Sequence, residues 1–137
     1  MAVLSEQEIE AYLAEPHVAQ MVTVRSDGRP HMAPVWFLAE GRRVLVMAHA
    51  NAVKLRNVRQ NPAVALSVAT DQRPYKYVVL EGEGRITGRD LLQVVERICV
   101  QYDGPEEGPA YAKVLLSEGP MVLLDIRVTR VIGWKHD

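Results

Sequence analysis

Three basic and two amide side chains fall together in the stretch AVKLRNVRQ, residues 52–60, which holds no acidic residue. The stretch predicts a short helix, and Lys54 and Asn57, three positions apart, then project from the same side of it. A cation is unfavourable at the positive N-terminal end of a helix unless an anion binds there. We therefore interpret the stretch as a phosphate-binding helix. The alternative is a solvated basic face, with Arg56 and Arg59 among its charges.

Aromatic residues in strand-like stretches offer a second kind of chemistry. In HMAPVWF, residues 31–37, Trp36 and Phe37 can pack in a core or against a flat ligand. Pro34 removes one backbone donor, which leaves neighbouring polar groups free to meet the edge of a heterocycle. Tyr77 can serve in packing, in a dimer contact or as a hydrogen-bond donor to a ligand. Trp134 can cover either the core or a bound ring, and both alternatives stay open.

No set of residues predicts catalysis without a cofactor. The chain has no nucleophile elbow, no dinucleotide motif and no P-loop. Its histidines are far apart, so we expect no metal site. Cys99 lies on the apolar stripe of a predicted helix and is interpreted as a buried spectator. If the chain is an enzyme, we expect a cofactor to be the reactive centre, and no catalytic side chain is assigned. The histidines are His17, His31, His49 and His136.

Length and charge limit the class of protein. The 137 residues suit one domain, residues 1–137, and the formal net charge of -1 excludes a broad surface for nucleic acid or an anionic membrane. No apolar run approaches the roughly 20 residues of a membrane helix. The N-terminal stretch is acidic and amphipathic, unlike a signal peptide. With one cysteine in the chain, these features predict a cytoplasmic protein.

The elements that must position these residues follow from hydrophobic periodicity and turn signals. Ser5 and Glu8 predict a capping box that opens a helix over residues 5–15. Alternating residues predict strands over 18–25, 31–39, 44–48, 61–70, 71–87 and 121–134, the first three forming an antiparallel meander. Gly82 and Gly84 predict a bend or bulge. Further helices are expected over 52–60 with Asn51 as N-cap, 90–102 and 110–119, the last two separated at the sequence GPEEGP. The pattern is mainly β with short α-helices, typical of a small barrel.

Four stretches, in this order, resemble the split β-barrel flavin and deazaflavin oxidoreductases. They are TVRSDGRPHMAPVWFL, NAVKLRNVRQNPAVALSV, PYKYVVLEGEGRIT and VLLDIRVTRVIGW, and the resemblance covers nearly the whole chain. That superfamily includes the pyridoxamine 5'-phosphate oxidases and the F-420-dependent enzymes. Lys54-x-Arg56-Asn57, followed by Arg59-x-x-Pro62, is most similar to the F-420 branch. The resemblance implies a six-stranded antiparallel split β-barrel that forms a homodimer, with two cofactor sites at the subunit interface.

The resemblance also implies which residues bind the cofactor, coenzyme F-420 or FMN. Lys54 and Asn57 would hold its phosphate, with Arg56 assisting. The acidic tail of F-420 would meet Arg25, Arg29 or Arg56. Two residues, Tyr77 and Trp134, would come from the other subunit. The ring of the cofactor would be lined by Ala33, Pro34, Val35, Trp36, Met47 and Ala48.

The function implied is an oxidoreductase that exchanges a hydride between F-420 or FMN and a small conjugated organic substrate. The slight preference for F-420 rests on the Lys-x-Arg-Asn helix. Because the chain stops shortly after Trp134, without the longer basic segment of the vitamin oxidases, we expect it not to oxidise pyridoxamine phosphate. The alternatives are a non-catalytic FMN or F-420 carrier or sensor, and a dimerisation module with an empty groove.

Overall fold

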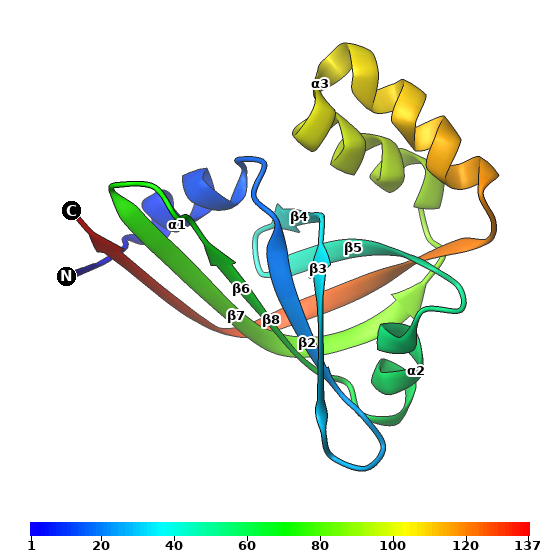
Figure 1. Cartoon of the computed structure of the whole chain (residues 1–137), viewed down its shortest axis with the longest axis horizontal. Helices are drawn as coiled ribbons and strands as arrows, with labels where there is room; N and C mark the ends of the chain where they lie inside the picture. Colours follow the sequence, from blue (N-terminus) through cyan, green and yellow to red (C-terminus); the bar gives the residue numbers. More distant parts are fainter.

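One antiparallel sheet of eight strands organises the chain, and the computed structural model describes all residues from 1 to 137 (Figure 1). The strand order is β3-β2-β6-β7-β8-β5-β4, and β1 pairs with β8. The strands are β1 (Ala2–Val3), β2 (Ala19–Val24), β3 (Pro30–Val35), β4 (Phe37–Glu40), β5 (Arg43–His49), β6 (Ala63–Ala69), β7 (Tyr75–Thr87) and β8 (Met121–His136). The helices are α1 (Glu6–Leu13), α2 (Val53–Gln60) and α3 (Leu91–Ser117).

The edge strands β3 and β4 are consecutive in the chain and separated only by Trp36. The sheet therefore curls until its edges lie near each other, as Figure 1 shows, but no ladder joins them. The prediction of a mainly β, antiparallel fold is confirmed. The prediction of six strands, with one strand over residues 31–39 in a meander, is wrong. Apolar residues continue through Trp36 without a turn signal, while the hydroxyl of Tyr102 accepts the backbone N–H of Phe37 at 3.1 Å.

Two hydrophobic cores lie on opposite faces of the sheet. The inner face holds a core of 20 buried residues, which include Met21, Phe37 and Ile126. The outer face carries a second core of eight buried residues beneath α3, among them Leu123 and the free Cys99. Because side chains alternate between the faces of a strand, Val44 and Val46 of β5 belong to the inner core and Leu45 between them to the outer core.

The break predicted between two helices at GPEEGP is confirmed within α3. Gly104 has a φ of 92°, a conformation that glycine adopts without a side-chain clash. The two halves of α3 fold back against each other in Figure 1. They approach closely at Gly108, where an added Cβ would lie 2.7 Å from the backbone nitrogen of Val100. None of the three helices combines the length and the apolar character needed to cross a lipid bilayer.

The bulge predicted near Gly82 is also confirmed. The register between β7 and β8 shifts between Glu81 and Gly82. A Cβ at Gly82 would overlap the carbonyl group of Arg127, so only glycine allows the two strands to approach this closely. The bulge increases the local twist of the two longest strands and so helps the sheet to curl.

The predicted capping box of α1 is formed and is tied to the last strand. The backbone N–H of Glu8 donates to Ser5 Oγ at 3.1 Å, and the Glu8 carboxylate accepts from the backbone N–H of Ser5 at 3.0 Å and from Lys135 Nζ at 2.7 Å. The hydrogen bond from Lys135, with that from Ser5, lowers the pKa of Glu8 to about 2. Both hydrogen bonds favour the ionised form of Glu8.

We expect this pairing to stabilise the fold above pH 4.5 and to be lost as the pH falls towards 2, because the folded-state pKa is the lower one. Urea unfolding across that range measures the free energy of unfolding. The wild-type value should exceed that of Glu8→Gln above pH 4.5, and the difference should disappear as the pH falls. Glu6→Gln, which removes a charge from the same turn but no ion pair, is the control. The same pH dependence in wild type and Glu8→Gln would contradict the assignment.

Candidate functional site

The N-terminus of α2 presents unpaired donors and an unpaired cation. Its N-cap is Ala52 rather than the predicted Asn51, and no side chain caps the helix. The backbone N–H groups of Val53 and Lys54 donate to no group of the chain. Lys54 is half-buried, forms no ion pair with an acidic residue, and its burial lowers the pKa of the ammonium group. Helix N–H groups and a partly desolvated ammonium group are together suited to bind an anion.

Asn57 lies one turn after Lys54 but faces the interior. Its Nδ2 donates to Oγ1 of the buried Thr23 on β2 at 3.0 Å. Arg56, the third residue predicted to hold the phosphate, is exposed. The structure thus anchors the helix through Asn57, while Lys54 and the free backbone N–H groups remain available for a ligand.

Sequence reasoning missed His31 as a member of this region. His31 lies opposite Thr23 in the register of β3 and β2, so both side chains project from the inner face. Its Nδ1 is buried and has no hydrogen-bond partner. An unpaired buried nitrogen next to the anchor of α2 is what a ligand-binding region would contain, since burial without a partner costs free energy. The alternation of β3 was the only signal available, and it does not distinguish a ligand contact from a core histidine.

The residues predicted to line a ring do not form one patch of side chains. Val35 and Ala48 are buried in the inner core. Pro34 is exposed, and Trp36 and Met47 pack against the outer core. Ala33 pairs in register with the buried Met21, which places it on the inner face.

These residues share unpaired strand edges instead. β3 pairs only with β2, and the ladder between β4 and β5 ends where Phe37 pairs with Val46. Beyond that pair, residues 47–49 of β5 have no partner on the β4 side. Backbone N–H and C=O groups along these edges can meet the polar edge of a heterocycle.

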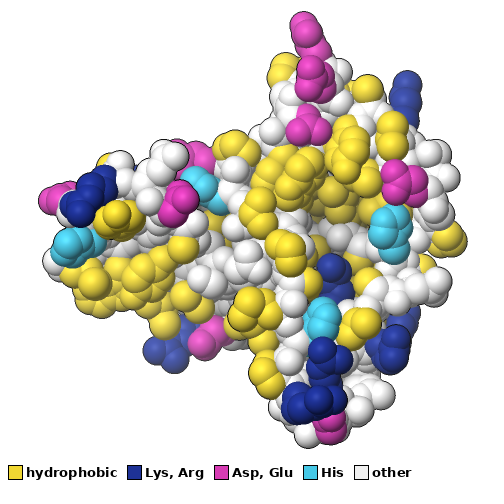
Figure 2. All heavy atoms as spheres, viewed as in Figure 1, with side chains coloured by type: hydrophobic (Ala, Val, Ile, Leu, Met, Phe, Trp, Pro, Cys, Tyr) yellow, Lys and Arg dark blue, Asp and Glu magenta, His cyan; other side chains and the backbone are white.

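Trp36 is held in an aromatic cluster rather than free to cover a ligand. Its ring stacks on Tyr102, with centroids 4.5 Å apart and an interplanar angle of 5°, and lies 5.8 Å from Tyr111. The Tyr102 hydroxyl donates to the carbonyl of His17 at 2.7 Å, which fixes its ring. Figure 2 shows hydrophobic side chains gathered between α3 and the adjoining ends of β3 and β4. The cluster secures α3 over the point where the two edges separate.

Tyr77 and Trp134 come together at the far end of the sheet. They pair directly across β7 and β8 and line a cavity of about 180 Å³. The strand that follows α2, β6, begins at Ala63, and Ala63 pairs with Glu83 near the other end of β7. Helix α2 therefore lies toward that end of the sheet. Within one chain the structure therefore separates Tyr77 and Trp134 from Lys54.

Comparison with known proteins identifies the family. Residues 5–135 match the family model of pyridoxamine 5'-phosphate oxidase. The chain belongs to the pyridoxamine 5'-phosphate oxidase family. No curated protein matches it in sequence.

Solved structures share the pyridoxamine 5'-phosphate oxidase fold with this chain. The conserved hypothetical protein Rv2991 from Mycobacterium tuberculosis superposes with a TM-score of 0.83 at 24% identity, over 98% of this chain and 86% of its own. An F420 reductase superposes with a TM-score of 0.73 at 29% identity, over 89% and 94%. HutZ, a heme storage protein from Vibrio cholerae, superposes with a TM-score of 0.74 at 19% identity, over 96% of each chain. The fold thus serves more than one function.

Proposed function

We propose that this member of the pyridoxamine 5'-phosphate oxidase family is an oxidoreductase that binds coenzyme F-420 or FMN. The observation that carries the proposal is the half-buried, unpaired Lys54 beside the free N–H groups of Val53 and Lys54. Both cofactors present a phosphate that would neutralise this ammonium group. The bound cofactor supplies hydride exchange with a small conjugated substrate. The resemblance of the α2 sequence to the F-420 branch, and 29% identity to an F420 reductase, support F-420.

In this proposal the chain binds and orients rather than supplying an acid or base. Lys54 and the α2 N–H groups hold the phosphate, and Asn57 keeps the helix seated on β2 through Thr23. The unpaired edges of β3 and β5 meet the polar edge of the ring through backbone groups. His31 Nδ1, buried and without a partner, is available to the same ligand.

We also propose that the working form is a homodimer. Tyr77 and Trp134 reach a cofactor only as residues of a second copy, because they lie at the other end of the sheet from α2. The outer face of β6 supports such a contact, since its side chains are small enough for another sheet to pack closely. These residues are Ala63, Ala65, Ser67 and Ala69. Light scattering of the purified protein measures the oligomeric state, and a monomer that binds cofactor fully would contradict this role.

The first test is the absorbance of the purified protein, followed by fluorescence titration with FMN and with F-420. Flavin absorbance bands or saturable FMN binding identify FMN, and saturable quenching of F-420 identifies the deazaflavin. Turnover with the reduced cofactor and conjugated acceptors then tests catalysis. Binding without turnover supports the second candidate, a cofactor carrier or sensor, which the fold's use in the storage protein HutZ favours. A protein that binds neither cofactor would refute both candidates.

Lys54→Ala is expected to weaken cofactor binding by about 1.5–3 kcal/mol, roughly ten- to a hundredfold, because a charge-assisted hydrogen bond to the phosphate is lost. The dissociation constant from fluorescence titration measures the effect. Arg59→Ala is the matched control, since Arg59 is an exposed cation in the last turn of the same helix. Equal dissociation constants for wild type and Lys54→Ala would remove Lys54 from the site.

A further inference from the structure

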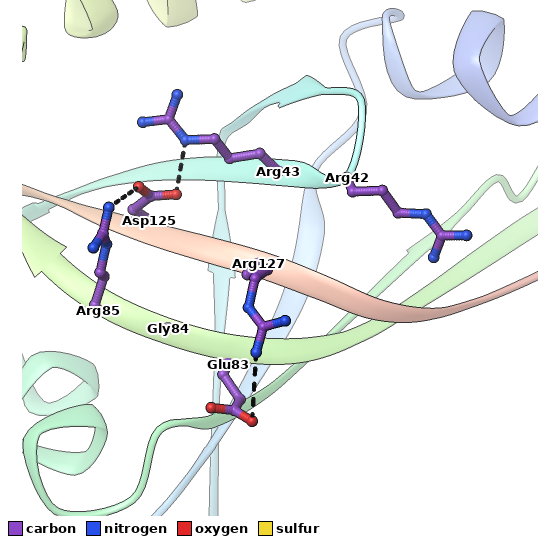
Figure 3. Close-up of a pocket in the computed structure, with 7 residues that line it drawn as sticks. All are labelled: Arg42, Arg43, Glu83, Gly84, Arg85, Asp125 and Arg127. Atoms are coloured by element: carbon purple, nitrogen blue, oxygen red, sulfur yellow. Dashed lines mark hydrogen bonds and ion pairs between the residues drawn. The ribbon is translucent and has the colours of Figure 1, made fainter.

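A cavity of about 500 Å³ on the outer face of the sheet has an all-polar lining and a large excess of arginine. Figure 3 shows side chains from β5, β7 and β8 in two groups, Arg43 and Arg85 with Asp125 and Arg127 with Glu83, while Arg42, in the turn before β5, extends away from both. None of the seven lining residues is hydrophobic, and none belongs to α2. The residues are Arg42, Arg43, Glu83, Gly84, Arg85, Asp125 and Arg127.

Strand register forces like charges together in this cavity. Arg43 on β5 lies directly opposite Arg127 on β8, and Arg127 is in turn opposite Glu83 on β7. Like charges at directly opposed positions of an antiparallel pair destabilise it. The only carboxylate beside Arg127 is that of Glu83, at 4.0 Å, which is a weak ion pair between exposed groups. Each of the two arginines thus has one carboxylate partner, Asp125 for Arg43 and Glu83 for Arg127, and only the first of these ion pairs is close.

Asp125 binds one of the arginines and lies near a second. Its side chain is 8% exposed; its Oδ1 accepts a hydrogen bond from Arg43 Nε at 2.9 Å, and its Oδ2 lies 3.7 Å from a terminal nitrogen of Arg85. Figure 3 shows both guanidinium groups reaching Asp125 from opposite sides. Only Nε of Arg43 is engaged by Asp125, so its two terminal nitrogens remain free to donate. One buried carboxylate thus orients the guanidinium group of Arg43 and attracts that of Arg85, and both groups keep unused donors.

The charge balance identifies the kind of ligand. Four arginines and two carboxylates line the cavity, which leaves two positive charges in excess in a chain whose formal net charge is -1. The planar guanidinium group matches the oxygens of phosphate and carboxylate groups. The lining holds no hydrophobic side chain to bind the apolar part of a ligand.

We propose that this cavity binds a small oxyanion with two or more negative charges, a phosphate compound or a polycarboxylate. The site is independent of the phosphate-binding residues proposed on α2, with which it shares no side chain. Its ligand accepts hydrogen bonds from the nitrogens of Arg43 and Arg85 that Asp125 does not engage. Its negative charge also reduces the repulsion between Arg43 and Arg127. Gly84 forms part of the wall through its backbone, because a side chain there would contact Leu124 and Val64 in the core.

Calorimetric titration with inorganic pyrophosphate and with citrate, at low salt, tests the proposal. The Lys54→Ala protein is used throughout, so that binding at α2 does not add to the signal. We expect saturable binding of at least one probe, weakened about tenfold or more when Arg85 and Arg127 are both replaced by glutamine. A preference for pyrophosphate indicates a phosphate compound, and a preference for citrate indicates a polycarboxylate.

The replaced side chains are 81% and 72% exposed, so the double variant is expected to fold normally, which thermal unfolding checks. Arg130→Gln is the matched control, because Arg130 lies on the same strand as Arg127 and forms a similarly weak ion pair, with Glu81 at 3.9 Å. The proposal is overturned if the Lys54→Ala protein binds neither probe. It is also overturned if Arg130→Gln weakens binding as much as the double variant does.

Discussion

Phe37→Ala is expected to lower the free energy of unfolding by about 3–5 kcal/mol, the range for removing a fully buried aromatic side chain. Phe37 has no exposed surface and belongs to the inner core. It is also the first residue of β4, directly after Trp36, where the chain passes from one edge of the sheet to the other. Its loss opens a cavity at the point where the two edges separate. Urea unfolding monitored by circular dichroism measures the change.

Leu92→Ala is the control for Phe37, because Leu92 is a large apolar residue on α3 whose side chain is mostly exposed. Its replacement is expected to change the free energy of unfolding by no more than about 0.5 kcal/mol. Phe37→Leu retains much of the buried volume and should fold. Cofactor titration of this variant then tests whether a change at the start of the edge strand β4 affects binding. If Phe37→Ala lowers the free energy of unfolding no more than Leu92→Ala does, Phe37 does not hold the edge strand in place.

Gly82→Val is expected to destabilise the fold by roughly 3 kcal/mol or more, because its side chain cannot be accommodated without moving backbone. A Cβ at this position overlaps the carbonyl of Arg127 and lies 3.0 Å from the Cα of Val128. Neither neighbour is a flexible side chain, so the two central strands must separate at the bulge. Thermal and urea unfolding measure the loss.

Gly88→Val provides the comparison for Gly82. Gly88 follows β7 directly, and an added Cβ there meets no atom within 4 Å. We expect its replacement to change stability by less than about 0.5 kcal/mol. Similar losses for the two variants would show that valine is disfavoured by backbone conformation in general and not by the close approach at the bulge.

Local signals predicted the parts of the fold that depend on neighbours in sequence. The capping box of Ser5 and Glu8, the short helix bearing Lys54, the bulge at Gly82 and the break at Gly104 are each determined by a few adjacent residues. The split at Trp36 could not be predicted in this way. What stabilises it is the hydrogen bond from the backbone N–H of Phe37 to the hydroxyl of Tyr102, 65 residues later. Pro34 indicates an edge strand or a bulge, but not that the strand divides at Trp36.

The candidate site likewise combines residues that local sequence signals predict with residues that only long-range contacts reveal. Lys54 stands out from its own helix, because a cation in the first turn without an acid nearby is a local anomaly. The partner of Asn57 is Thr23, 34 residues earlier, and the unpaired nitrogen of His31 is evident only from the packing around it. The arginine cavity depends on the register of three strands. No spacing in the sequence indicates that register.

The central position of β8 has a consequence for how the protein forms in the cell. This last strand pairs with β1, β5 and β7, so that Ala2 meets Lys135 and Arg43 meets Arg127. During synthesis, the earlier strands have no partner on those sides until residues 121–136 leave the ribosome. Folding dominated by such distant pairings is slow, on the order of milliseconds to seconds. The nascent chain therefore carries exposed strand edges, and slower translation or chaperones that cover them should raise the yield of native protein.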